Sequence, residues 1–152
     1  MFTNPLLRLS LFLLVTVGGG LLIGLLNVPG QWYSGLAKPS FNPPNWIFGP
    51  VWTVLYVMIA IAGWRVTRSD WDNWPARFWA TQLILNFFWS PTFFSLHVIG
   101  MALGIIGLML LTIVGFIASA FTRDRLAAAL FVPYAAWVSF ALALNAAIWR
   151  LN

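Results

Sequence analysis

The chain has 152 residues, of which 61% are hydrophobic and only 7% are charged, eight Lys or Arg and three Asp. A soluble domain carries about 25% charged residues because its surface must face water. These figures exclude most soluble enzymes and indicate that lipid surrounds most of the chain. The sequence also contains no cysteine and one histidine, His97, so it offers no disulfides and no cysteine-based metal site.

Four stretches of the sequence carry no charge, and one of them, residues 78–122, is long enough for two spans of about 20 residues. The break between these two spans is predicted near Ser95 and His97, after Pro91. We predict an all-α membrane protein, a bundle of five transmembrane helices in a single domain over residues 1–152. The helices are expected at about residues 6–26, 46–66, 75–94, 98–121 and 124–149, with an outer loop at 27–45.

Local signals support these boundaries. Asn45, Asn73 and Asp124 are predicted to cap the second, third and fifth helices. Pro91 and Pro133 fall inside predicted helices, where a proline removes a backbone hydrogen bond, so we expect kinks there.

The first segment has an alternative interpretation as a cleaved signal peptide, because Arg8 precedes its apolar run. That run covers residues 9–26, longer than the core of about 7–15 residues that is typical of a signal peptide, and no clear A-x-A cleavage site follows it. We therefore favour a membrane span.

The basic residues predict the orientation. Five spans place the two termini on opposite sides of the membrane, with six basic residues on the side of the N terminus and two, Lys38 and Arg150, on the other. The positive-inside rule then puts the N terminus in the cytoplasm, and the C terminus and the 27–45 loop on the opposite side. The basic residues form no run, so the net charge of +5 does not indicate a nucleic-acid partner.

Pairs of small residues four positions apart allow helices to approach closely. They occur at Gly20 and Gly24, at Ala76 and Ala80, and at Gly100 and Gly104. They have two interpretations: packing within the bundle, or, on the third helix, a dimer interface through Ala76 and Ala80.

Aromatic and amide residues recur at helical spacing on three of the predicted helices. Uncharged amides in a membrane helix normally face protein, because lipid offers no hydrogen-bond partner. When the predicted orientation is applied, most of these stripes fall in the outer half of the bundle, where they can surround one cavity. The stripes are Phe48, Trp52 and Tyr56; Trp79, Gln82, Asn86, Trp89 and Phe93; and Tyr134, Trp137, Ala141, Leu144 and Asn145.

The 27–45 loop contains Trp32 and Tyr33 and is stiffened by Pro39, Pro43 and Pro44. It is either a lid over this cavity or a loop that only seals the bundle. A cavity lined by aromatic rings and a few amides, without buried charge, suits a flat and largely apolar ligand; the alternative is that the rings simply fill the core.

Three blocks of this sequence resemble the TspO/MBR family, the tryptophan-rich sensory protein/translocator protein or peripheral-type benzodiazepine receptor family, and we expect a bacterial member. The resemblance covers all five predicted helices, of which the fourth is the least distinctive. The blocks are Trp32-Tyr33-x-x-Leu36-x-Lys38-Pro39-x-x-x-Pro43-Pro44-x-Trp46-x-Phe48-x-Pro50-Val51-Trp52-Thr53-x-Leu55-Tyr56; Gln82-Leu83-x-Leu85-Asn86-x-x-Trp89-Ser90; and Pro133-Tyr134-x-x-Trp137-Val138-x-Phe140-Ala141-x-x-Leu144-Asn145-x-x-Ile148-Trp149-Arg150.

The resemblance implies a homodimer that binds tetrapyrroles such as protoporphyrin IX and haem, and benzodiazepine-type ligands such as PK11195. The tetrapyrrole would be a ligand, with no cofactor or metal required. The sterol pattern of animal members lacks its tyrosine here, with Ala146 in that place, so this pattern leaves sterol binding open. Carried over by motif, the binding residues would be Trp32, Tyr33, Trp52, Tyr56, Asn86, Trp89, Trp137, Ala141 and Asn145.

Three functions stay open on the sequence alone. The first is a receptor for porphyrins in stress sensing or regulation, and the second is a facilitative transporter of porphyrins or sterol-like lipids, since no intramembrane carboxylate is available for proton coupling. The third is light-dependent porphyrin breakdown, for which the resemblance suggests Trp52 and Trp137; no conventional acid–base pair is predicted. His97 is either a ligand to haem iron or a polar residue of a turn.

Overall fold

The computed structural model describes residues 4–152, so the first three residues of the predicted domain lie outside the described part. Every regular element in residues 4–152 is helical, as predicted. The elements are α1 (Pro5–Leu13), η1 (Leu14–Gly18), α2 (Gly19–Leu26), α3 (Gln31–Gly35), η2 (Asn45–Ile47), α4 (Phe48–Val66), α5 (Trp74–Ser90), η3 (Pro91–Ser95), α6 (Ile99–Phe121) and α7 (Arg125–Leu151).

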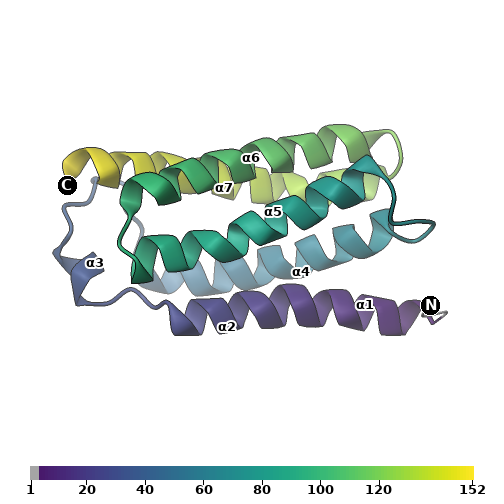
Figure 1. Cartoon of the computed structure of the whole chain (residues 1–152), viewed down its shortest axis with the longest axis horizontal. Coiled ribbons are helices and arrows are strands. Elements are labelled where there is room, and N and C mark those ends of the chain that lie inside the picture. The colour runs from purple at the N-terminus through teal and green to yellow at the C-terminus, as the bar shows by residue number, and fades with distance from the viewer. Residues whose placement is uncertain (1–3) are drawn as a thin grey trace.

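The long helices lie side by side along one axis (Figure 1). The segments α1, η1 and α2 follow one another without a break and form one rod, which packs on α4, while α6 packs between α5 and α7. The C terminus and α3 lie at one end of the bundle, and the start of α1 and the α4–α5 and α6–α7 loops lie at the other (Figure 1). The loop at residues 27–45 is therefore at the opposite end of the molecule from most of the basic residues.

Four helical segments are long and apolar enough to cross a membrane: Pro5–Leu26, Asn45–Val66, Ile99–Phe121 and Arg125–Leu151. Four of the five predicted spans therefore coincide with helices that could cross a membrane. The remaining long helix, α5, has only 17 residues of α-helix and carries Arg77, Gln82 and Asn86, which lower its mean hydropathy.

Two of the three predicted caps are confirmed. The Asn73 side chain accepts a hydrogen bond from the Ala76 N–H (2.9 Å), and the Asp124 side chain accepts one from the Ala127 N–H (3.0 Å). The prediction for Asn45 was wrong: Asn45 is the first residue of η2 and Pro44 precedes it without a side-chain cap. The short 3₁₀ turn η2 precedes α4, so Asn45 lies inside this turn and not at the cap position.

The two interior prolines behave differently. Pro91 begins the π-helical turn η3, in which the Leu96 N–H donates to the Pro91 oxygen five residues earlier (2.9 Å). A π-turn of this kind accommodates the missing proline N–H. Pro133 lies inside α7, which continues as an α-helix on both sides of it.

Aromatic rings pack in the core where α6 meets α7. Phe116 and Phe131 stack with ring centroids 3.8 Å apart, and both are completely buried. Many apolar side chains on the outer faces are exposed, for example Leu25 at 74% and Leu111 at 68%. Exposed apolar side chains on long helices match a lipid environment.

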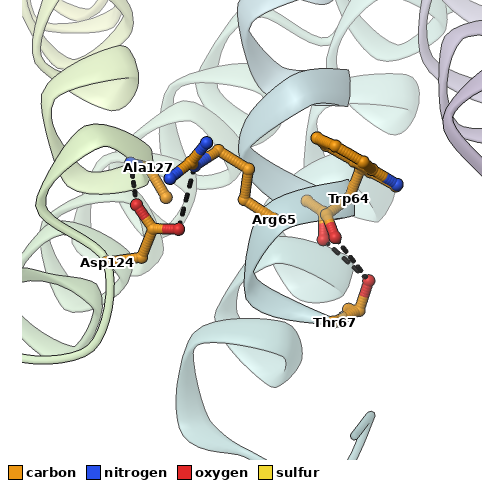
Figure 2. Close-up of polar contacts among 6 residues, drawn as sticks. Trp64, Arg65, Thr67, Asp124 and Ala127 are labelled. Atoms are coloured by element: carbon orange, nitrogen blue, oxygen red, sulfur yellow. Dashed lines mark hydrogen bonds and ion pairs between the residues drawn. The ribbon is translucent and has the colours of Figure 1, made fainter. Parts of the chain in front are cut away.

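An ion pair holds α4 to the α6–α7 loop at the end opposite the 27–45 loop. The Arg65 Nε lies 2.9 Å from Asp124 Oδ2, and Figure 2 shows the same carboxylate reaching the Ala127 N–H. Burial raises the pKa of Asp124, but the hydrogen bonds from Ala127, Arg65 and Leu126 and the charge of Arg65 outweigh burial and hold that pKa below its usual range. Next to it, the Thr67 hydroxyl donates back to carbonyls of α4, including that of Trp64 (Figure 2).

Candidate functional site

A cavity of about 460 Å³ lies under the 27–45 loop, between α2, α4, α5 and α7. Its volume is within the range of about 300–1,000 Å³ that is usual for small-molecule sites. Aromatic and aliphatic side chains form most of its wall, and no charged side chain of residues 4–152 lines it.

Seven of the nine predicted binding residues line this cavity. They come from four separate parts of the chain, and the helical stripes in α4, α5 and α7 therefore do converge. The seven are Tyr33, Trp52, Tyr56, Asn86, Trp89, Ala141 and Asn145.

The structure does not place Trp32 on the cavity wall. Its indole stacks on the His97 ring, with centroids 4.0 Å apart, and meets Phe93 edge to face. His97 follows the end of η3 with a left-handed φ of 59° and is also absent from the wall. This pair joins the 27–45 loop to the α5–α6 turn, and nothing in the geometry supports His97 as a ligand to haem iron.

Trp137 also lies off the wall. Its ring contacts the cavity-lining Phe48 edge to face, with centroids 5.9 Å apart. The Trp137 Nε1 is buried and has no hydrogen-bond partner among residues 4–152. Trp52, by contrast, lines the cavity and stacks on Tyr56 at 5.4 Å.

A buried chain of hydrogen bonds begins at the cavity wall. The Tyr56 hydroxyl donates to Asn86 Oδ1 (2.8 Å), and Asn86 Nδ2 donates to the Tyr134 hydroxyl (2.9 Å). Tyr134 in turn donates to Gln82 Oε1 (2.8 Å), and Gln82 Nε2 donates to the Trp79 carbonyl (3.0 Å). The chain ties α4, α5 and α7 together behind the cavity.

A second, shorter chain orients Trp89. Its indole N–H donates to Asn145 Oδ1 (3.1 Å), and Asn145 Nδ2 donates to the Ile99 carbonyl (3.2 Å). Asn86 and Asn145, two of the asparagines on the wall, therefore bond to protein through oxygen and nitrogen alike. Their first role in this structure is to hold aromatic rings in position, because unsatisfied amides are costly inside a membrane bundle.

Tyr33 brings the 27–45 loop into the cavity. The side chain is 4% exposed, packs edge to face on Phe93 and Phe94, and its hydroxyl donates to Asn42 Oδ1 (3.2 Å). Lys38 Nζ lies 4.6 Å from the centre of the Tyr33 ring. Burial raises the pKa of Tyr33 more than the Asn42 hydrogen bond lowers it.

The 27–45 loop is fastened at both ends of α3. Before it, Asn27 Oδ1 accepts a hydrogen bond from the Ser95 hydroxyl. After it, the Ala37 N–H donates to Asn152 Oδ1 and Asn152 Nδ2 donates to the Ala37 oxygen, both at 3.0 Å. The loop thus forms a wall of the cavity, and the helix α3 within it was not predicted.

The contribution of α2 to the cavity wall was not predicted from the sequence. Gly20 and Gly24 line the cavity, although their spacing indicated only helix packing. A Cβ on Gly20 would lie 2.2 Å from the Tyr56 ring, so the absence of a side chain is what admits this ring. The small-residue spacing was the available signal, but it did not indicate what the space would hold.

The pair proposed for a dimer interface is differently exposed. Ala76 is only 3% exposed within a single chain, so its side chain is already covered, while Ala80 is half-buried against the core. An interface that uses Ala76 is therefore not supported by the packing of the chain.

The fold and the cavity together define a class: an integral, multi-pass α-helical membrane protein with an aromatic cavity under a folded loop. The chain belongs to the TspO/MBR family, whose sequence profile matches residues 11–150. It is 38% identical over 133 residues to Protein CrtK of Rhodobacter capsulatus, covering 85% of this chain and 83% of the relative.

Two further relatives span most of the chain. The tryptophan-rich sensory protein of Cereibacter sphaeroides is 36% identical over 144 residues, which cover 95% of this chain and 91% of the relative. The human translocator protein is 35% identical over 145 residues, which cover 88% of this chain and 83% of the relative.

Proposed function

We propose that this protein binds tetrapyrroles such as protoporphyrin IX and haem, and flat benzodiazepine-type ligands such as PK11195, in the cavity under the 27–45 loop, and that it acts in porphyrin-linked sensing or transport. The observation that carries the proposal is the uncharged, aromatic wall formed by Trp52, Tyr56 and Trp89. Such rings favour planar ligands through stacking. Membership of the TspO/MBR family supports the same ligand class.

The polar groups of a porphyrin would lie at the loop end. Lys38 sits on the 27–45 loop and Arg150 in the last turn of α7, and either cation can meet a propionate. The tetrapyrrole core would then occupy the charge-free part of the cavity.

The same proposal includes five membrane spans, with α5 and η3 as the third. Residues 74–95 form one continuous helical segment that lies parallel to its neighbours (Figure 1), and α5 packs on α6 along the bundle. The charge distribution favours a cytoplasmic N terminus. We propose a homodimer on the family resemblance, with its interface on a surface that does not depend on Ala76.

A pair of tryptophan substitutions tests the ligand site. Trp52→Ala should weaken protoporphyrin IX binding by about twofold to thirteenfold, because an aromatic contact contributes about 0.5–1.5 kcal/mol beyond the area it buries. Trp137→Ala, which removes a ring outside the wall, should change the dissociation constant less than twofold. The measurement is titration of the purified protein, followed by the Soret band and by tryptophan quenching. Equal effects of the two substitutions, or none, would overturn the assignment.

Light-dependent porphyrin breakdown is the second candidate function, since Trp52 lines the cavity and stacks on Tyr56. The test is illumination of the protoporphyrin complex with the Soret band as readout. Loss of the band no faster than for free porphyrin would reject this function, while Trp52→Phe should slow any loss that occurs.

A further inference from the structure

A second cavity, of about 660 Å³, lies at the opposite end of the bundle from the 27–45 loop. It is formed between the first rod and the loop that joins α4 to α5, and the proposed tetrapyrrole site does not use it. Its wall consists of Arg8, Leu11, Phe12, Val15, Thr67, Arg68, Ser69, Asp70, Trp71 and Trp79.

One part of this wall is apolar. Phe12 is buried, stacks on Trp71 with centroids 5.5 Å apart and meets Trp79 edge to face at 4.9 Å. Leu11 and Val15 continue this surface along the first rod, and Val15 is 51% exposed. The cavity therefore opens toward the side of the bundle that faces acyl chains.

The other part of the wall is cationic. The Arg8 guanidinium donates to the carbonyl oxygens of Thr67 and Arg68, which fixes it at the end of α4. The Arg68 guanidinium lies 4.9 Å from the centre of the Trp64 ring. Within residues 4–152, the carboxylates that form ion pairs are Asp124 and Asp72, and their partners are Arg65 and Arg77.

The one acidic residue of the wall, Asp70, is engaged elsewhere: its Oδ1 accepts a hydrogen bond from Asn73 Nδ2 (3.1 Å). Arg8 and Arg68 have no carboxylate partner within residues 4–152, and the wall contains one carboxylate of these residues, that of Asp70. The cavity therefore carries a net positive charge. Cations at the membrane boundary beside an apolar groove match a molecule with an anionic head and acyl chains.

We propose that this cavity is a binding site for a phospholipid with a net negative head group. Arg8 and Arg68 would bind the head-group phosphate, and Leu11, Phe12 and Val15 would contact the first part of an acyl chain. A free phosphate ion would use only the cationic half of the wall, so the apolar half favours a lipid. This inference does not depend on the tetrapyrrole site.

Native mass spectrometry of the whole protein in detergent can test the proposal. The probes are dioleoylphosphatidylglycerol and dioleoylphosphatidylcholine, which share acyl chains and differ in net charge. The wild type should prefer the anionic lipid, and Arg68→Gln should reduce that preference by about fivefold, the factor that corresponds to about 1 kcal/mol for one basic residue near an anionic surface.

Two further variants separate the cavity from general surface charge. Arg125→Gln is the matched control, because Arg125 also lies over an aromatic ring, that of Phe121 at 5.4 Å, but outside the cavity; it should leave the preference unchanged. Val15→Trp should reduce occupancy by filling the apolar half, with the thermal unfolding midpoint as the check on folding. Equal losses for Arg68→Gln and Arg125→Gln, no preference in the wild type, or displacement of lipid by inorganic phosphate would each overturn the proposal.

Discussion

Gly20 shows how a single residue sets the shape of the cavity. The Tyr56 ring fills the space that a side chain at position 20 would need, and the Tyr56 hydroxyl is fixed by its bond to Asn86. We expect Gly20→Ala to destabilise the protein by about 1–3 kcal/mol, the usual cost of overpacking, and to weaken ligand binding. Thermal unfolding and a porphyrin titration measure both effects.

Gly24 provides the matched control, since a Cβ there meets no atom within 4 Å although the residue lines the same cavity. Gly24→Ala should be neutral or stabilising by up to about 1 kcal/mol, because alanine favours helix. Equal destabilisation at the two positions would contradict the packing argument.

Residue spacing predicted much of the site because helical periodicity determines which side chains share a face. Trp52 with Tyr56, and Asn86 with Trp89, reached the cavity for this reason. Trp137 did not, because Phe48 from another helix occupies the wall beside it, and spacing within one helix cannot show what a neighbouring helix contributes. The glycines of α2 carry no functional group, so their place in the cavity wall could not be predicted from the sequence either.

At the scale of elements, the 27–45 loop is held by the Asn152 side chain through two bonds to Ala37. Asn152→Ala removes both bonds, which together contribute about 1 kcal/mol. Ligand release should therefore become about fivefold faster, and hydrogen exchange at residues 36–38 should increase. Stopped-flow release and exchange mass spectrometry report these changes.

Ser139→Ala is the control on the same helix, because that exposed hydroxyl bonds only to the Ala135 oxygen of its own helix. It should leave both rates unchanged. An Asn152→Ala protein with the wild-type release rate would show that this fastening does not govern the loop.

The Arg65–Asp124 pair joins α4 to the α6–α7 loop, and it predicts that the stability of the protein depends on pH. Because the folded-state pKa of Asp124 is lowered, the stability it contributes is present above the unfolded value of about 3.9 and is lost as the pH falls through the lower folded value. Asp124→Asn keeps a capping side chain but loses the pair. The unfolding midpoint of this variant should lie below that of the wild type at pH 7, and the gap should close below pH ~3.9.

Asp72→Asn serves as the comparison, since the Asp72–Arg77 pair is largely exposed, at 85% and 57% for the two side chains. An exposed pair contributes little to stability, so the unfolding midpoint of Asp72→Asn should follow that of the wild type across the pH range. A gap for Asp124→Asn that stays constant to pH 2.5 would contradict the lowered pKa.

Caps and helix ends were largely predictable at this scale because they depend on local chemistry, as Asn73 and Asp124 show. The helix α3 was not, because its five residues are too few to show a period. Its position depends on distant contacts, such as Trp32 with His97.

At the scale of the whole molecule, the absence of cysteine makes the proposed topology directly testable. Single cysteines at Ser69, in the α4–α5 loop, and at Leu96, in the α5–α6 turn, flank the third proposed span, formed by α5 and η3, and both positions are exposed. A membrane-impermeant maleimide should label Leu96→Cys from outside and Ser69→Cys only after permeabilisation.

Ser34→Cys, on α3, should be labelled from the same side as Leu96→Cys if the 27–45 loop faces outward. Labelling of the Ser69 and Leu96 variants from one side would show that α5 does not cross the membrane. Composition and length predicted the four long apolar helices, but α5 falls below the hydropathy of its neighbours because its amides serve the interior.

The buried hydrogen bonds behind the cavity have a common direction. From Tyr56 through Asn86, Tyr134 and Gln82, each group donates a hydrogen bond to the next, so neighbouring bonds polarise one another. At the cavity wall this array ends with the Tyr56 oxygen, whose hydrogen is already donated to Asn86. The cavity therefore presents an acceptor at that point, and it should select ligands that carry an N–H or O–H there over ligands of the same shape that offer only lone pairs.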